Sequence, residues 1–199
     1  MAFDHNEHYH DLLVREVPEG ASRALDVGCG AGAFARRLAG LGLEVDAIDT
    51  VPMLDAARNM PESVRFRQLD ITSADLPERH YDFISCLASI HHVPFATVTR
   101  LRRALAPGGR LVILGLYRES TLTDFLVSMA AVPANAVARL VTAGRPRTGR
   151  AVMPTTDPVM TLPEIRAAAA DLLPGATIRR LLFWRYLLVY TEPRETSAG

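Results

Sequence analysis

Five short apolar segments alternate with helical segments between Arg23 and Leu116, and this alternation constrains the fold more than any other feature. The expected strands are residues 23–27, 44–48, 64–69, 81–87 and 110–116, and the expected helices are residues 11–17, 33–41, 52–60 and 93–105. Strands separated by helical stretches favour βαβ units, in which neighbouring strands run parallel. We therefore predict an α/β fold with a doubly wound, mostly parallel sheet and helices on both faces.

The alternation stops after the fifth expected strand. Residues from about 118 to 160 are expected to form a helical insertion, because residues 121–141 are apolar at helical spacing. Thr161-Leu-Pro-Glu164 then matches a capping box, in which the first and last side chains each bind the other's backbone N–H. This motif predicts a helix that begins there and ends at Leu173.

The last two expected strands are residues 176–183 and 186–191, joined by a tight turn at Trp184-Arg185. So short a link requires the two strands to be antiparallel. A mainly parallel sheet is therefore expected to end in a hairpin. We expect residues 1–199 to form a single domain with an N-terminal cap at residues 1–20.

Charge balance and cysteine content exclude several classes of function. The 22 basic residues, all arginines, balance 22 acidic residues, so neither nucleic acid nor a membrane is expected as a partner. Cys29 and Cys86 cannot form a disulfide framework, and no Cys-x-x-Cys pair exists for zinc, so no metal is expected. No signal peptide and no apolar run of about 18 residues is present, which favours a cytoplasmic protein.

The stretch Asp26-Val-Gly-Cys-Gly-Ala-Gly32, between an expected strand and an expected helix, is the most informative motif. Glycines let the backbone turn sharply and approach a ligand closely. Two ligand classes fit this geometry. A dinucleotide would place its pyrophosphate on the helix N-terminus. S-adenosyl-L-methionine (SAM) has no phosphate, and its ammonium group needs an acceptor such as the Asp26 carboxylate.

Carboxylates also end the next two expected strands. Asp49 ends the second strand, where it can reach the hydroxyls of a ribose in either ligand. Asp70 ends the third strand, where it can accept from an adenine amino group, with Leu69 and Ile71 as apolar cover. The sequence Leu-Ala-Pro-Gly-Gly-Arg-Leu at residues 105–111 links a helix to the fifth strand.

These four motifs together resemble those of the class I SAM-dependent methyltransferases, and the resemblance covers residues 23–116 closely. It implies a Rossmann-like seven-stranded sheet in the order 3-2-1-4-5-7-6 with one antiparallel strand. It also implies SAM as the cofactor, with S-adenosylhomocysteine as the product. The cofactor contacts that it implies are Asp26, Gly28, Gly30, Gly32, Asp49, Thr50, Leu69, Asp70, Ile71 and Ala88.

The segment after the fourth strand reads Ser85-Cys-Leu-Ala-Ser-Ile-His-His-Val-Pro94 and should pass the methionine part of SAM. It lacks the Asn/Asp-Pro-Pro-aromatic motif of the family's enzymes that methylate nucleic-acid bases. His91 is a candidate general base and His92 a weaker one, because imidazole can accept a proton near neutral pH. The alternative is that one histidine caps the next helix and the other is solvated.

Two segments are candidates to cover the site. In this family the N-terminal segment commonly folds over the cofactor, so Tyr9 is expected to contact SAM or to line the acceptor site. The alternative is a partly disordered leader. The insertion is expected to form a lid over an acceptor pocket for an apolar small molecule, or else a helix pair at the edge of the domain.

The predicted function is transfer of the sulfonium methyl group of SAM to an oxygen, nitrogen or carbon atom of a small-molecule acceptor. A SAM-binding protein of the same fold that catalyses a cyclisation or rearrangement is the first alternative. A non-catalytic SAM-binding subunit is the second. A monomer or a homodimer is compatible with either reading.

Overall fold

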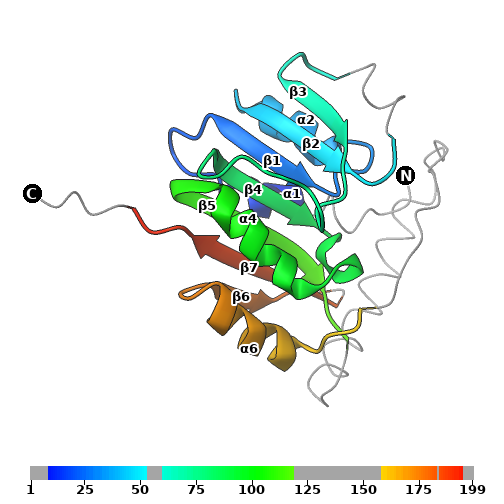
Figure 1. Ribbon diagram of the computed structural model, residues 1–199, viewed down its shortest axis with the longest axis vertical. Helices are drawn as coiled ribbons and strands as arrows, with labels where there is room; N and C mark the ends of the chain where they lie inside the picture. Colours follow the sequence, from blue (N-terminus) through cyan, green and yellow to red (C-terminus); the bar gives the residue numbers. More distant parts are fainter. Residues whose placement is uncertain (1–8, 53–59, 119–157, 183, 195–199) are drawn as a thin grey trace, which may run out of the picture.

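A seven-stranded sheet in the order β3-β2-β1-β4-β5-β7-β6 forms the centre of the computed structural model, which describes residues 9–52, 60–118, 158–182 and 184–194 (Figure 1). Strands β1 to β5 pair in parallel, and β7 is antiparallel to both β5 and β6. The strands are β1 (Arg23–Val27), β2 (Glu44–Asp49), β3 (Val64–Gln68), β4 (Tyr81–Leu87), β5 (Leu105–Leu116), β6 (Thr177–Arg180) and β7 (Arg185–Thr191). The predicted strand order and the single antiparallel strand are confirmed.

Helices cover both faces of this sheet, which is why the central strands are apolar on both sides. In β4, Phe83 packs into the core on one face and Ile84 into the core on the other. Helices α1 (His10–Val14) and α2 (Ala33–Ala39) cover the face of Phe83, and α4 (Val98–Ala104) and α6 (Leu162–Leu172) cover the face of Ile84 (Figure 1). The predicted doubly wound arrangement is therefore confirmed.

The helix expected at residues 93–105 is shorter than predicted. Val93 is extended (φ −129°, ψ 158°) because the ring of Pro94 disfavours helical backbone in the residue before it. Two short 3₁₀ segments, η2 (Ile90–His92) and η3 (Phe95–Thr97), therefore precede α4. The helix expected at residues 11–17 is also too long, since α1 ends at Val14 and the chain then turns.

Strand β5 begins at Leu105 rather than at residue 110, so the Pro-Gly-Gly segment lies within the strand. Leu105 is extended (φ −70°, ψ 134°) and pairs with Tyr81. A Cβ atom at Gly109 would lie 2.8 Å from the carbonyl oxygens of both Tyr81 and Ala106, so only glycine fits there without a shift. The glycine thus allows β5 to start close to β4.

The terminal elements follow the prediction with shifted limits. The Thr161 hydroxyl accepts from the Glu164 N–H (3.4 Å), and the Glu164 carboxylate accepts from the Thr161 N–H (2.7 Å), which confirms the capping box. The hairpin is also present, but the turn is centred before Arg185, which already belongs to β7. Trp184 has a left-handed backbone (φ 58°) in that turn. Most of the expected insertion and of the helix at residues 52–60 lies outside the described residues.

Candidate active site

The strand order reverses between β1 and β4. The chain adds β2 and β3 on one side of β1, and then adds β4 and β5 on its other side. Ligands of doubly wound sheets bind beyond the carboxyl ends of the strands at such a point. Ser89 joins the two strand ends, since its hydroxyl donates to the carbonyl oxygen of Val27 (2.9 Å). Ala88 has a strained left-handed backbone (φ 51°), held by a hydrogen bond from its N–H to Leu114 (2.7 Å).

The glycine loop follows β1 at this point. Gly28, Gly30 and Gly32 all have positive φ, at 69°, 51° and 73°. The Gly28 N–H donates to the carbonyl oxygen of Ile48 (2.8 Å), which ties the loop to β2. A Cβ atom at Gly28 would lie 2.7 Å from the Ser89 Oγ atom, so the loop passes directly against the residue that joins β1 and β4.

Asp26 lies under this loop with 1% of its surface exposed. Its Oδ1 atom accepts from the Ser85 hydroxyl (2.8 Å), whereas the buried Oδ2 atom has no hydrogen-bond partner among the described residues. Burial raises the pKa of Asp26 to about 6, and interactions with the Ser85 hydroxyl and the Ala35 backbone only partly offset this increase. A buried carboxylate oxygen without a donor fits a cationic ligand group, such as the ammonium group of SAM.

We expect SAM affinity to fall about tenfold between pH 7 and pH 5, because Asp26 with a pKa of about 6 becomes protonated over this range. Protonation removes the negative charge that would bind the ammonium group. Isothermal titration calorimetry across this range measures the effect. Asp26→Asn should bind SAM weakly at pH 7 and show no further tenfold loss at pH 5. The same pH dependence in Asp26→Asn would exclude Asp26 as its cause.

Asp49 is the second buried carboxylate at this edge, with 8% of its surface exposed. Its Oδ2 atom accepts from the N–H of Gly30 (2.9 Å), and its Oδ1 atom accepts from the N–H of Val51 (3.1 Å). Each carboxylate oxygen can accept a further hydrogen bond, so the group can bind hydroxyls as well. Asp49 therefore shapes the glycine loop in addition to the ribose contact expected from the sequence.

The other expected cofactor contacts lie next to Asp49, at the ends of β2 and β3. The Leu69 N–H donates to the Asp49 carbonyl oxygen (2.8 Å), and Leu69 is partly buried. Asp70 is exposed, and hydrogen bonds from the Thr72 N–H and hydroxyl (both 2.8 Å) lower its pKa. Thr50 is exposed, whereas Ile71 packs into the core on the α4 side with 7% of its surface exposed.

His91 and His92 form η2, immediately beyond β4. Their ring centroids are 4.0 Å apart. His91 is partly buried, and its Nδ1 atom is buried without a hydrogen-bond partner in the described part of the chain. Burial, with smaller effects from His92 and Arg185, lowers the pKa of His91 to about 4. His91 is therefore neutral at physiological pH, but it is a weaker base than an ordinary histidine.

Tyr9 immediately precedes α1 and packs into the core on the α1 and α2 side of the sheet. It is 7% exposed, and its hydroxyl donates to the carbonyl oxygen of Leu182 in the β6–β7 turn (3.2 Å). The sequence interpretation missed two residues of this region, Ser89 and Arg185. Ser89 stood inside the segment assigned to the site, but Arg185 was assigned only to the turn, and no local pattern marks it as buried.

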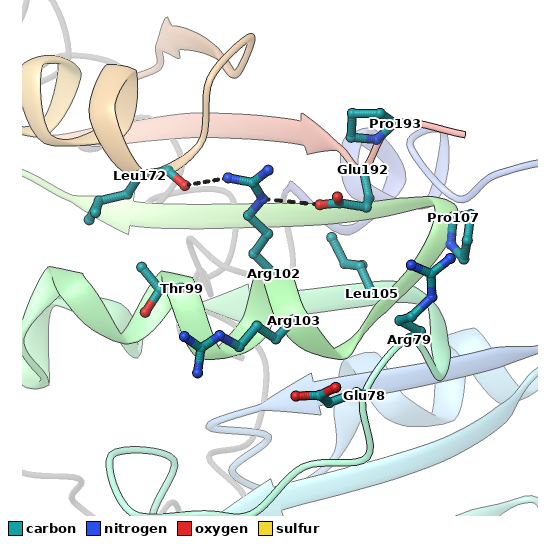
Figure 2. Close-up of a pocket in the computed structure, with 10 residues that line it drawn as sticks. All are labelled: Glu78, Arg79, Thr99, Arg102, Arg103, Leu105, Pro107, Leu172, Glu192 and Pro193. Atoms are coloured by element: carbon teal, nitrogen blue, oxygen red, sulfur yellow. Dashed lines mark hydrogen bonds and ion pairs between the residues drawn. The ribbon is translucent and has the colours of Figure 1, made fainter. Parts of the chain in front are cut away.

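A separate pocket of about 450 Å³ opens at the opposite, amino-terminal edge of the sheet (Figure 2). Figure 2 shows Arg102 between α6 and the end of β7, where it donates to the Leu172 carbonyl oxygen (3.3 Å) and the Glu192 carboxylate (3.2 Å). These hydrogen bonds connect α4 to α6 and to the end of β7. The pocket lies away from the glycine loop and from the three strand-end carboxylates, so it is not the candidate active site.

Among the residues that the structure describes, no group of three or more His, Cys, Asp or Glu side chains is placed to hold a metal ion. No described helix is both long and apolar enough to span a membrane. Burial raises the pKa of the Cys86 thiol to about 12, and that of Cys29 further, so neither thiol is ionised at neutral pH.

Known proteins match the chain in sequence and in fold. The family model described as "Methyltransferase domain" matches residues 25–113. An uncharacterised methyltransferase of Mycobacterium tuberculosis is 35% identical over 94% of this chain and 96% of its own length. A ubiquinone biosynthesis O-methyltransferase of Xylella fastidiosa is 34% identical over 67% of this chain and 56% of its own length.

A solved structure of similar fold is the 1,6-didemethyltoxoflavin-N1-methyltransferase of Burkholderia thailandensis, with bound 1,6-didemethyltoxoflavin and S-adenosylhomocysteine. It has a TM-score of 0.64 and 19% sequence identity, over 94% of this chain and 77% of that chain. Together the sheet order, the motifs and these matches define an enzyme with the Rossmann-like, SAM-binding fold. The chain belongs to the class I SAM-dependent methyltransferase family, and SAM is its methyl donor.

Proposed function

We propose that the protein methylates a small molecule, most readily at an oxygen atom. The observation that carries this proposal is the state of His91 in η2. Its imidazole is neutral at physiological pH, and its buried Nδ1 atom has no hydrogen-bond partner among the described residues. This imidazole can accept a hydrogen bond from an acceptor hydroxyl. The ubiquinone biosynthesis O-methyltransferase and the toxoflavin-type N-methyltransferase support a small acceptor by their names. The balanced charge of the chain offers no broad attraction for nucleic acid.

The proposed cofactor contacts divide among the three strand-end carboxylates. Asp26 accepts from the ammonium group of the methionine part, which supplies the missing donor for its Oδ2 atom. Asp49 accepts from the ribose hydroxyls while it holds Gly30. Asp70 accepts from the adenine amino group, and Leu69 contributes apolar cover. SAM supplies a methyl group on a sulfonium leaving group, so the protein contributes mainly alignment of the acceptor.

Labelled SAM tests the size class of the acceptor. Protein incubated with methyl-labelled SAM and an extract of the source organism should place the label in the small-molecule fraction. Mass spectrometry should then show a methylated product together with released S-adenosylhomocysteine. Label in protein or nucleic acid would contradict the proposal. A changed metabolite without the label would indicate a cyclisation or rearrangement, and no change in any fraction would indicate a non-catalytic subunit.

His91→Ala is expected to lower kcat less than about tenfold, because a base with a pKa of about 4 adds little to proton removal. The wild-type rate should also show no loss from imidazole protonation until the pH approaches 4, unlike an ordinary histidine at 6.5. Steady-state rates with an identified acceptor measure both effects. A loss of about 10²–10⁴-fold with unchanged SAM affinity would instead assign general-base catalysis to His91.

A further inference from the structure

A buried arginine lies at the edge of the sheet where the parallel strands end, which is also the edge of the candidate active site. Arg185 begins β7, has 8% of its surface exposed and pairs with Leu116 at the end of β5. Side chains alternate between faces along a strand, and Leu187 lies in the core on the α1 and α2 side. Arg185 therefore lies on that side too, at the edge where β4 and β5 end.

Two residues from distant parts of the chain lie near its guanidinium group. The charge of Arg185 contributes to the low pKa of His91, which burial mainly causes. It also opposes the rise in the pKa of Tyr9 that burial produces. Tyr9 also donates to the carbonyl oxygen of Leu182, three residues before Arg185, so it contacts the turn that leads into β7. Tyr9, which precedes α1, and His91 in η2 therefore both lie within electrostatic range of Arg185 at the start of β7.

A guanidinium group at this position has the chemistry of an oxyanion receptor. Its five N–H donors form a rigid fork that matches the two oxygens of a carboxylate or the oxygens of a phosphate. Five donors also allow the group to keep a protein partner and still bind a ligand. The Nδ1 atom of His91, which has no partner in the described part of the chain, offers a second polar contact. An apolar side chain would fill a buried strand end at lower cost in desolvation.

We propose that the methyl acceptor carries an oxyanion group, either a carboxylate or a phosphate, and that Arg185 binds this group beside His91. This inference rests on the proposed function, because it describes the acceptor of that same site. The acceptor then has two ends. The anionic end binds at β7, and the nucleophilic atom points toward the end of β4.

Matched acids and amides test the proposal on protein saturated with S-adenosylhomocysteine. Isothermal titration of benzoate, benzamide, phenyl phosphate, hexanoate and hexanamide separates anionic recognition from apolar contact. We expect benzoate or phenyl phosphate to bind tenfold or more tightly than benzamide, or hexanoate to bind tenfold or more tightly than hexanamide. A preference for benzoate or hexanoate identifies a carboxylate, and a preference for phenyl phosphate identifies a phosphate. No anion preference in the wild-type protein would overturn the proposal.

Three variants assign this preference to one residue. Arg185→Gln should lose at least tenfold of the anion preference, with affinity for S-adenosylhomocysteine unchanged within twofold. Arg185→Lys should retain part of it, since it keeps the charge but not the fork. The matched control is Arg179→Gln, an exposed arginine on the adjacent strand β6, which should behave like wild type. Equal losses in Arg179→Gln and Arg185→Gln, or a preference that survives Arg185→Gln, would contradict the proposal.

A different result would contradict the proposed function, namely the absence of labelled small molecules in the experiment with methyl-labelled SAM. A protein that methylates an uncharged small molecule and shows no anion preference would retain the function and lose only this inference. A folded Arg185→Gln protein that no longer binds S-adenosylhomocysteine would place Arg185 in the support of the cofactor site, and would also overturn the inference.

Discussion

Gly28→Ala is expected to weaken SAM binding by at least about a hundredfold. Gly28 has a φ of 69°, which costs an alanine about 1–2 kcal/mol. The added Cβ atom would also lie 2.7 Å from the Ser89 Oγ atom and closer still to its Cβ atom. Because Ser89 is tied to Val27, either the glycine loop or η2 must move. Isothermal titration with S-adenosylhomocysteine measures the loss.

Two companion variants separate the steric clash from the backbone strain. Gly20→Ala has a similar φ of 77° but no atom within 4 Å of the added Cβ, so it should lose some stability and no cofactor affinity. Adding Ser89→Gly to Gly28→Ala removes the side chain that clashes, and should recover at least about tenfold in affinity. No recovery in the double variant would show that relief of the clash is not sufficient, because of the backbone strain at residue 28 or the loss of the Ser89–Val27 hydrogen bond.

Asp49→Ala is the second variant with a large expected effect, a loss of SAM affinity between about tenfold and a thousandfold. Hydrogen bonds to a charged group contribute about 1.5–3 kcal/mol each, and the variant loses the proposed ribose contacts. It also loses the acceptors that hold the N–H groups of Gly30 and Val51. Equilibrium binding of SAM measures the loss, with circular dichroism to confirm that the variant is folded.

Glu44→Ala is the matched control for Asp49→Ala, because it removes a carboxylate from the opposite end of the same strand. Glu44 forms an ion pair with Arg65 (3.5 Å) in which both side chains are mostly exposed, and such pairs contribute little. Its SAM affinity should match that of wild type. Unchanged affinity in folded Asp49→Ala would move the ribose contact to another residue.

The parts of the site that follow local patterns were predictable from the sequence. Asp26, Asp49 and Asp70 each stand at or next to the end of a short apolar segment, and parallel strands bring such ends to one edge. The glycine loop and the capping box at Thr161 were predictable for the same reason, because each is a motif of consecutive residues. The antiparallel hairpin followed from the shortness of its turn, and only its limits were wrong by a few residues.

The remaining features depend on contacts between distant segments. The Gly28–Ser89 contact joins residues that follow two different strands. The Asp26 oxygen that has no partner among the described residues is apparent only once the surrounding core is known. The low pKa of His91 has largely the same origin, since it arises mainly from burial, with smaller effects from His92 and Arg185. Arg185 resembles any charged turn residue until α1 and β7 are placed together.

The raised pKa of Asp26 also bears on how long the protein survives without its cofactor. Since the folded state favours the protonated form, this group stabilises the fold below pH 4 and loses that contribution as the pH rises to about 6. At neutral pH the empty protein therefore carries a buried charge that costs about 3 kcal/mol. A bound ammonium group would offset this cost, so the empty protein should unfold and be degraded faster than the occupied one. The supply of methyl donor in the cell would then set the amount of enzyme as well as its rate.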